Sequence, residues 1–126
     1  MRVDVQKNKP GFCTAVPHGP IDSSTYEDFQ KQINHLLAPG VKNLLIDLVN
    51  VDYISSAGLG VLFSLKKSLG ASGGELGFCN LKPQIKKLFE IVKALPKENI
   101  FESEKEADRY FYKMMNDEID NQRKKS

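Results

Sequence analysis

The chain has 126 residues, and its apolar share of 40% is enough to fill one hydrophobic core of ordinary domain size. Its 18 Lys and Arg residues are nearly balanced by 16 Asp and Glu residues, which excludes the broad basic surface typical of nucleic-acid binding. The sequence contains no apolar stretch of about 18 residues, and its N-terminus is unlike a signal peptide. We therefore expect a cytoplasmic protein without membrane insertion or direct nucleic-acid contact.

The two cysteines of the chain, Cys13 and Cys79, each lie in an apolar segment. No second cysteine or histidine stands at metal-ligand spacing from either of them. We therefore expect two reduced thiols in the core, and neither a metal nor another cofactor.

The first forty residues predict a hairpin followed by a helix. Pro10-Gly11 is a turn signal between two segments with strand-like apolar residues, so the sheet is expected to begin antiparallel. Ser24 and Glu27 have the spacing of a capping box, and apolar residues then recur at helical spacing over 26–37. Pro39-Gly40 is predicted to end this helix.

The middle of the chain predicts a parallel strand, helix and strand. Residues 44–48 form a nearly unbroken apolar run, which is typical of a strand covered on both faces. The next twenty residues place leucines on one helical face, and Gly73-Gly74 provides a stop. Residues 75–80 then form a second strand, joined to the first by a right-handed crossover.

The last third of the chain predicts two more helices and a short strand. Pro83 fits the first turn of a helix that continues to Val92, and residues 99–101 suit an edge strand. Ser103 and Glu106 form a second capping box. The last helix is expected to pack through the apolar residues Ala107, Tyr110, Phe111, Met114, Met115 and Ile119.

This order of elements predicts a single α/β domain over residues 1–119, with a mixed sheet of four to five strands and about four helices. Residues 120–126 are too polar to pack, and we expect them to form a frayed C-terminal tail.

The turn after the central strand, residues 47–60, has an unusual composition. Small residues gather at its end, namely Ser55, Ser56, Ala57, Gly58 and, one helical turn later, Gly60. Glycine inside a helix costs about 1 kcal/mol relative to alanine, and close approach of another surface is one reason to keep it. This edge of an open α/β sheet is also where ligands and partners usually dock.

Two interpretations of this turn stay open on the residues alone. In the first, Ser55 or Ser56 caps the helix, and the glycines allow close packing of the helix on the sheet. In the second, an exposed serine hydroxyl accepts a phosphate, whose charge the helix N-terminus stabilises. Nearby, Asp47 is expected to accept hydrogen bonds from the turn backbone, and Asp52 to initiate the turn through its side chain.

The segments GPIDSSTYEDF and NLLIDLVNVDYISSAGLGVLFSLKK together resemble the STAS domain family and, within it, the anti-sigma factor antagonists. The segments GGELGFCNLKPQIKKLFEI and IFESEKEA continue the likeness, which extends over residues 3–112. Its most specific part is the strand followed by Asp52, Tyr53, the Ser-rich turn and the GLG sequence.

The resemblance implies a non-catalytic switch protein. Such antagonists bind an anti-sigma factor that is also a serine kinase of the histidine-kinase ATPase type, and this frees a sigma factor. The kinase ends the association by phosphorylating the antagonist, and a metal-dependent serine phosphatase restores it. The family's phosphoacceptor falls on Ser56, and Asp22 matches an aspartate near that serine. The implied partner-binding residues are Asp22, Ser55, Ser56, Ala57, Gly58 and Gly60.

One departure from the family pattern leaves alternatives open. The antagonists commonly carry an acidic residue before the phosphoacceptor, whereas this chain has Ser55, which is also a second candidate acceptor. A constitutive STAS subunit of a membrane transporter or signalling assembly is the alternative function. A hydrolase triad of Ser56, His18 and Asp22 is disfavoured, because the turn lacks the Gly-x-Ser-x-Gly pattern of a nucleophile elbow.

Overall fold

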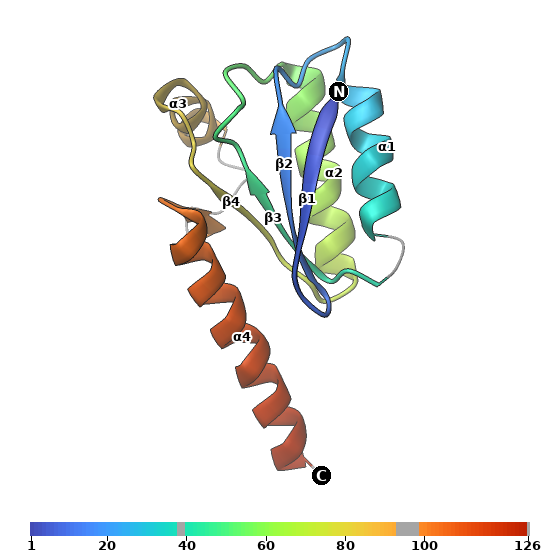
Figure 1. The fold of residues 1–126 in the computed structure, drawn as a ribbon, viewed down its shortest axis with the longest axis vertical. Coiled ribbons are helices and arrows are strands. Elements are labelled where there is room, and N and C mark those ends of the chain that lie inside the picture. The colour runs from blue at the N-terminus through green and yellow to red at the C-terminus, as the bar shows by residue number, and fades with distance from the viewer. Residues whose placement is uncertain (38–39, 93–98, 126) are drawn as a thin grey trace.

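A five-stranded mixed sheet forms the centre of the computed structural model, which describes residues 1–37, 40–92 and 99–125 (Figure 1). The strands follow one another across the sheet in sequence order, the first pair antiparallel and the rest parallel. Gly11, with φ of +82°, makes the hairpin turn at the predicted position. The strands are β1 (Arg2–Lys9), β2 (Phe12–His18), β3 (Asn43–Asp47), β4 (Leu76–Cys79) and β5 (Ile100–Phe101).

Three helices cover one face of the sheet, and one helix packs on the other. The first three are α1 (Tyr26–Leu37), α2 (Ser56–Ala71) and α3 (Pro83–Ile91). The fourth, α4 (Glu104–Lys125), contacts β3, β4 and β5 and extends beyond the body of the domain (Figure 1). None of the helices in the described part of the chain combines the length and the apolar composition that a bilayer-spanning helix needs.

The central strand supplies side chains to two separate cores. Leu44 and Ile46 belong to the larger core beneath α1, α2 and α3, whereas Leu45 points into a smaller core beneath α4. This alternation follows from the two-residue period of a strand. In the smaller core, Phe12 and Phe111 stack with ring centroids 4.7 Å apart. The predicted α/β fold, with its mixed sheet and buried central strand, is confirmed.

The two cysteines lie on opposite sides of this sheet. Cys13 belongs to the larger core and Cys79 to the smaller one, and both are free and buried. Burial raises the pKa of both thiols above the ordinary value, because a thiolate is poorly solvated in an apolar environment. Both cysteines are therefore core residues, as predicted.

The start of α1 and the length of α4 differ from the predictions. The Ser24 hydroxyl donates to Asp22 and Glu27 accepts from Tyr26, so Asp22 organises the first turn in place of the predicted capping box. The helix α4 continues to Lys125, because its polar residues include good helix formers and neither glycine nor proline interrupts them. Pro39, Ser126 and the side chain of Ile119 lie outside the described residues.

Candidate functional site

Backbone hydrogen bonds join two turns at the carboxyl edge of the sheet. The N–H of Ile21, in the turn after β2, donates to the Tyr53 carbonyl at 3.0 Å, and the Ser55 N–H returns to the Ile21 carbonyl at 2.9 Å. These bonds form a parallel bridge between Ile21 and Ile54. The turn after β2 and the N-terminus of α2 are therefore held together by main-chain contacts, whatever their side chains.

The two adjacent serines at this edge have different surroundings. Ser55 is the N-cap of α2, and its hydroxyl oxygen accepts the backbone N–H of Gly58 at 3.2 Å. Ser56 is the first helical residue and is exposed, whereas Ser55 is half-buried. The capping interpretation therefore applies to Ser55 and leaves the Ser56 side chain at the surface of the molecule.

The two glycines of the first helical turns also differ. Gly58 is buried, and a Cβ added there would collide with the Ile21 carbonyl oxygen and lie 3.0 Å from methyl groups of Ile21 and Ile54. Gly60 is exposed, and a Cβ there would meet nothing within 4 Å. Close packing of the helix on the turn explains Gly58 but not Gly60. Ala57, between Ser56 and Gly58, is half-buried.

Asp22 lies one residue after the bridge and stabilises its own turn. One carboxylate oxygen accepts the Ser24 hydroxyl at 2.7 Å and the Ser24 backbone N–H at 2.9 Å. These two hydrogen bonds are the main causes of a lowered pKa of the Asp22 carboxyl, because they favour its charged form. The bridge thus brings an ionised Asp22 to the same edge as Ser56, and the hydrogen bonds found for this carboxylate lie within its own turn.

Asp47 and Asp52 fix the loop between β3 and α2. Asp47 accepts the Val49 backbone N–H at 3.0 Å and the Asn80 side-chain amide at 3.1 Å, which confirms its predicted turn-binding role. The Asp52 side chain instead forms an ion pair with Lys82, immediately before α3. The expected local turn interaction of Asp52 is therefore replaced by a contact between loops, which sequence spacing could not reveal.

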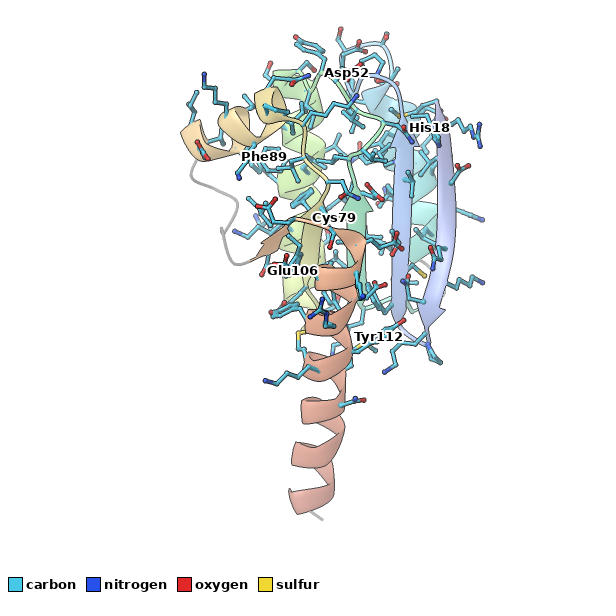
Figure 2. All side chains as sticks on the ribbon, turned by 60° about the vertical axis from the view of Figure 1, so that its left-hand side comes forward. His18, Asp52, Cys79, Phe89, Glu106 and Tyr112 are labelled. Atoms are coloured by element: carbon cyan, nitrogen blue, oxygen red, sulfur yellow. The ribbon has the colours of Figure 1, made fainter. Side chains whose placement is uncertain are left out.

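Two exposed apolar side chains on this loop were not included in the predicted partner-binding set. Val49 is 44% exposed and Tyr53 is 56% exposed. Asp52, which lies between them, appears with His18 at the same end of the molecule in Figure 2. Singly exposed apolar residues are common, but these two lie on the loop that leads directly to Ser56. They extend the candidate surface with apolar area.

The candidate hydrolase residues have other hydrogen-bond partners. A ring nitrogen of His18 lies 2.8 Å from Asp4 on the neighbouring strand β1, and that carboxylate also accepts from Arg2. Asp22 is bonded to Ser24, as described above. Across the described residues, no hydrogen bond links His18 to Ser56 or to Asp22, which gives the triad no support.

Comparison of the sequence with known proteins identifies the family of this chain. The sequence profile of the STAS domain matches residues 5–107. The chain is 36% identical over 81 residues to BtrV of Bordetella bronchiseptica, which is provisionally named an anti-sigma factor antagonist. The aligned region covers 64% of this chain and 70% of BtrV.

Solved structures share the fold at lower identity. The anti-sigma factor antagonist SpoIIAA in its unphosphorylated form has a TM-score of 0.76 at 16% identity, over 88% of this chain and 96% of that one. SpoIIAA from Bacillus in its phosphorylated form has a TM-score of 0.70 at 18% identity, and the match covers 86% of this chain and 99% of that one. A sulfate transporter family protein from Wolinella succinogenes has a TM-score of 0.76 at 17% identity, and the match covers 88% of this chain and 93% of that one. The chain therefore belongs to the STAS domain family, with relatives of the anti-sigma factor antagonist type.

Proposed function

We propose that this chain is a cytoplasmic anti-sigma factor antagonist, a non-enzymatic binding module that phosphorylation of Ser56 switches off. The observation that carries the proposal is the difference between the two adjacent serines. Ser55 caps α2 through its hydroxyl, whereas Ser56 is exposed at the first position of the helix. A phosphate can therefore be added at Ser56 while the cap that starts the helix stays in place.

The charge distribution of α2 favours a phosphate at this position. The first turn of α2 contains no acidic residue, so no side-chain carboxylate already occupies the positive end of the helix dipole. A phosphate adds about −1.5 to −2 charges at neutral pH. Beside the exposed Val49, Tyr53 and Gly60, this charge would oppose the docking of an apolar or acidic surface.

The proposed partner is an anti-sigma factor that is also a serine kinase of the histidine-kinase ATPase type, and a metal-dependent serine phosphatase would reverse the modification. We assign the docking surface to Asp22, Ala57, Gly60 and the two serines, together with Val49 and Tyr53. Gly58 contributes indirectly, because it is buried and lets α2 approach the turn. Ser55 is the less suitable acceptor, since this residue is half-buried and its hydroxyl oxygen accepts the backbone N–H of Gly58.

The phosphorylation site can be tested by intact-mass analysis after incubation with a candidate kinase of this type and Mg·ATP. We expect one phosphate on the wild type and none on Ser56→Ala. Ser55→Ala should still accept the phosphate, provided that circular dichroism shows a folded protein. Ser64→Ala is a matched control, because Ser64 is another exposed serine of α2. A phosphate retained by Ser56→Ala would reject Ser56 as the acceptor.

The switch itself is tested by the affinity of the anti-sigma factor for the unmodified and phosphorylated chains. We expect phosphorylation to weaken binding, and Ser56→Asp to weaken it less, because a carboxylate carries less charge than a phosphate. Equal binding of the two forms would contradict the mechanism, whatever the result with Ser56→Asp.

A second candidate is a constitutive STAS subunit of a membrane transporter or signalling assembly. The observation that favours it is the likeness in fold to the Wolinella sulfate transporter family protein. It predicts a partner that copurifies equally with the wild type, Ser56→Ala and the phosphorylated chain. Loss of the partner on phosphorylation would favour the antagonist instead.

A further inference from the structure

A hollow of about 550 Å³ lies at the end of the sheet opposite to Ser56, where the β1–β2 hairpin turn approaches the last turn of α1. This volume is within the range of small-molecule sites, roughly 300–1,000 Å³. The described residues that line it are Lys7, Lys9, Pro10, Gly11, Cys13, His35, Leu36, Gly40 and Val41. Cys13 is buried, and Leu36 and Val41 are half-buried, so much of the lining is apolar.

An apolar groove between β1 and α1 adjoins this hollow, and His35 and Leu36 line both. Val5 lies in the groove and pairs with Ala15, whose side chain belongs to the larger core. The Val5 side chain therefore points to the face of the sheet that α1, α2 and α3 cover, yet Val5 is 48% exposed. The helix α1 leaves this part of β1 uncovered, and apolar surface continues from the hollow along the edge strand.

The polar rim of the hollow and groove is cationic. The two lysines Lys7 and Lys31 are exposed at the rim, and the described residues that line the hollow and the groove include no Asp or Glu. Lys7 pairs with Cys13 across the hairpin, so its side chain lies on the same side of the sheet as the Cys13 thiol that lines the hollow. The Lys9 ammonium instead lies 4.7 Å from the centre of the Tyr112 ring of α4, so we assign the anion contact to Lys7.

We propose that the hollow and groove bind a small amphiphilic carboxylate. Its carboxylate pairs with Lys7, and its apolar body lies over Leu36 and against Val5. The apolar lining provides the driving force through burial, and the cationic rim selects an anion over a cation of the same size. This site is separate from the Ser56 surface and does not depend on the function proposed above.

The probes for this site are octanoate, 1-octanol and octylammonium, which share an apolar chain and differ in charge. We expect octanoate to shift the backbone amide resonances of Lys7, Cys13, His35 and Leu36 in a saturable way. Octanol should bind more weakly at the same residues, and octylammonium weakest of all. Equal affinity of octylammonium and octanoate, or octanoate shifts that do not saturate or spread evenly over the chain, would overturn the proposal.

Variants of the full chain separate the two parts of the site. Lys7→Glu should weaken octanoate binding about fivefold or more and leave octanol binding unchanged. Val5→Glu, at a half-exposed edge position, places a negative charge in the groove and should weaken octanoate binding without a large folding cost. Lys67→Glu, on the exposed surface of α2, is the matched charge control and should bind like the wild type.

A second copy of the chain is the competing occupant, because β1 is an edge strand. Light scattering during the octanoate titration distinguishes the two. A monomer that binds octanoate supports the proposal. A dimer that loses its contact on Val5→Glu, with no saturable octanoate binding, rejects it.

Discussion

The carbonyl oxygen of Ile21 accepts the backbone N–H of Ser55 at 2.9 Å and also closes the space above Gly58. One main-chain atom in the turn after β2 thus sets both the position of the N-cap of α2 and the size of the residue three positions later. The exposed Ser56 lies between these two fixed points. The candidate phosphoacceptor is therefore presented from the first turn of a helix whose start is held by main-chain hydrogen bonds.

Gly58→Ala is expected to destabilise the protein, and Gly60→Ala is not. The added methyl at Gly58 collides with main chain, which cannot move aside as a flexible side chain can. We expect a loss of about 1–3 kcal/mol in the free energy of unfolding, measured by urea denaturation. Gly60 has open space, so alanine there should be neutral or stabilising by up to about 1 kcal/mol. Equal destabilisation by both substitutions would contradict this division.

The same Gly60→Ala variant tests the docking surface. Because Gly60 is exposed beside the first turn of α2, a methyl group there should weaken binding of the anti-sigma factor while the fold stays intact. Isothermal titration calorimetry against the purified partner measures the change. Unchanged affinity would place Gly60 outside the interface, even if Ser56 is confirmed as the acceptor.

The two serines should separate stability from regulation. Ser55→Ala removes the oxygen that accepts the Gly58 N–H, and we expect it to cost about 1 kcal/mol of stability in urea denaturation. Ser56→Ala removes an exposed hydroxyl and should stay within about 0.5 kcal/mol of the wild type. The opposite order would assign the capping role to Ser56.

The layers of this fold were predictable because the local sequence signals agree with the tertiary packing. The apolar run at residues 44–48, the turn at Pro10-Gly11 and Pro83 at the first position of α3 each predict the element that is present. These signals come from the spacing of apolar residues and from the backbone preferences of Gly and Pro, and both act over only a few residues. The small residues around Ser56 likewise indicated the correct helix N-terminus.

The finer contacts depend on residues that are distant in sequence. The Asp52–Lys82 ion pair spans thirty positions, and the collision that requires glycine at 58 comes from Ile21 in another turn. Sequence spacing also left open which of the two serines caps the helix, because either hydroxyl can reach a backbone N–H. Only the placement of the turns against each other separates the cap from the exposed serine.

Phe111→Ala should remove much of the attachment of α4 to the sheet. Phe111 is fully buried, stacks on Phe12 and covers Gly77 of β4. We expect a loss of about 3–5 kcal/mol in the free energy of unfolding, or early proteolytic cleavage within α4 if this helix detaches locally. Lys113→Ala, at an exposed position of the same helix, is the control and should resemble the wild type in both measurements.

A pH series with Asp108→Asn tests two partly buried carboxylates in the first turns of α4, those of Glu104 and Asp108. Burial raises the pKa of Asp108, and burial together with the charges of Asp108 and Asp47 raises that of Glu104. A raised pKa in the folded state means that the ionised form opposes folding. This penalty is present at neutral pH. It is relieved as the pH falls through the folded pKa, and is gone below the unfolded value of about 4.

Asp108→Asn should therefore be more stable than the wild type at pH 7, by less than about 1 kcal/mol because the site is only partly buried. The side-chain amide of Asn8, which donates to Asp108 at 3.3 Å, can still donate to the asparagine oxygen. Urea denaturation between about pH 7 and pH 4 should show this difference shrinking toward zero.

Asp22→Asn is the opposite control: the pKa of Asp22 is lowered, so its ionised form stabilises the fold above the unfolded pKa. That variant should be less stable at pH 7, and its deficit should fade on acidification. An Asp108→Asn difference that is independent of pH would mean that the substitution acts through packing and not through charge.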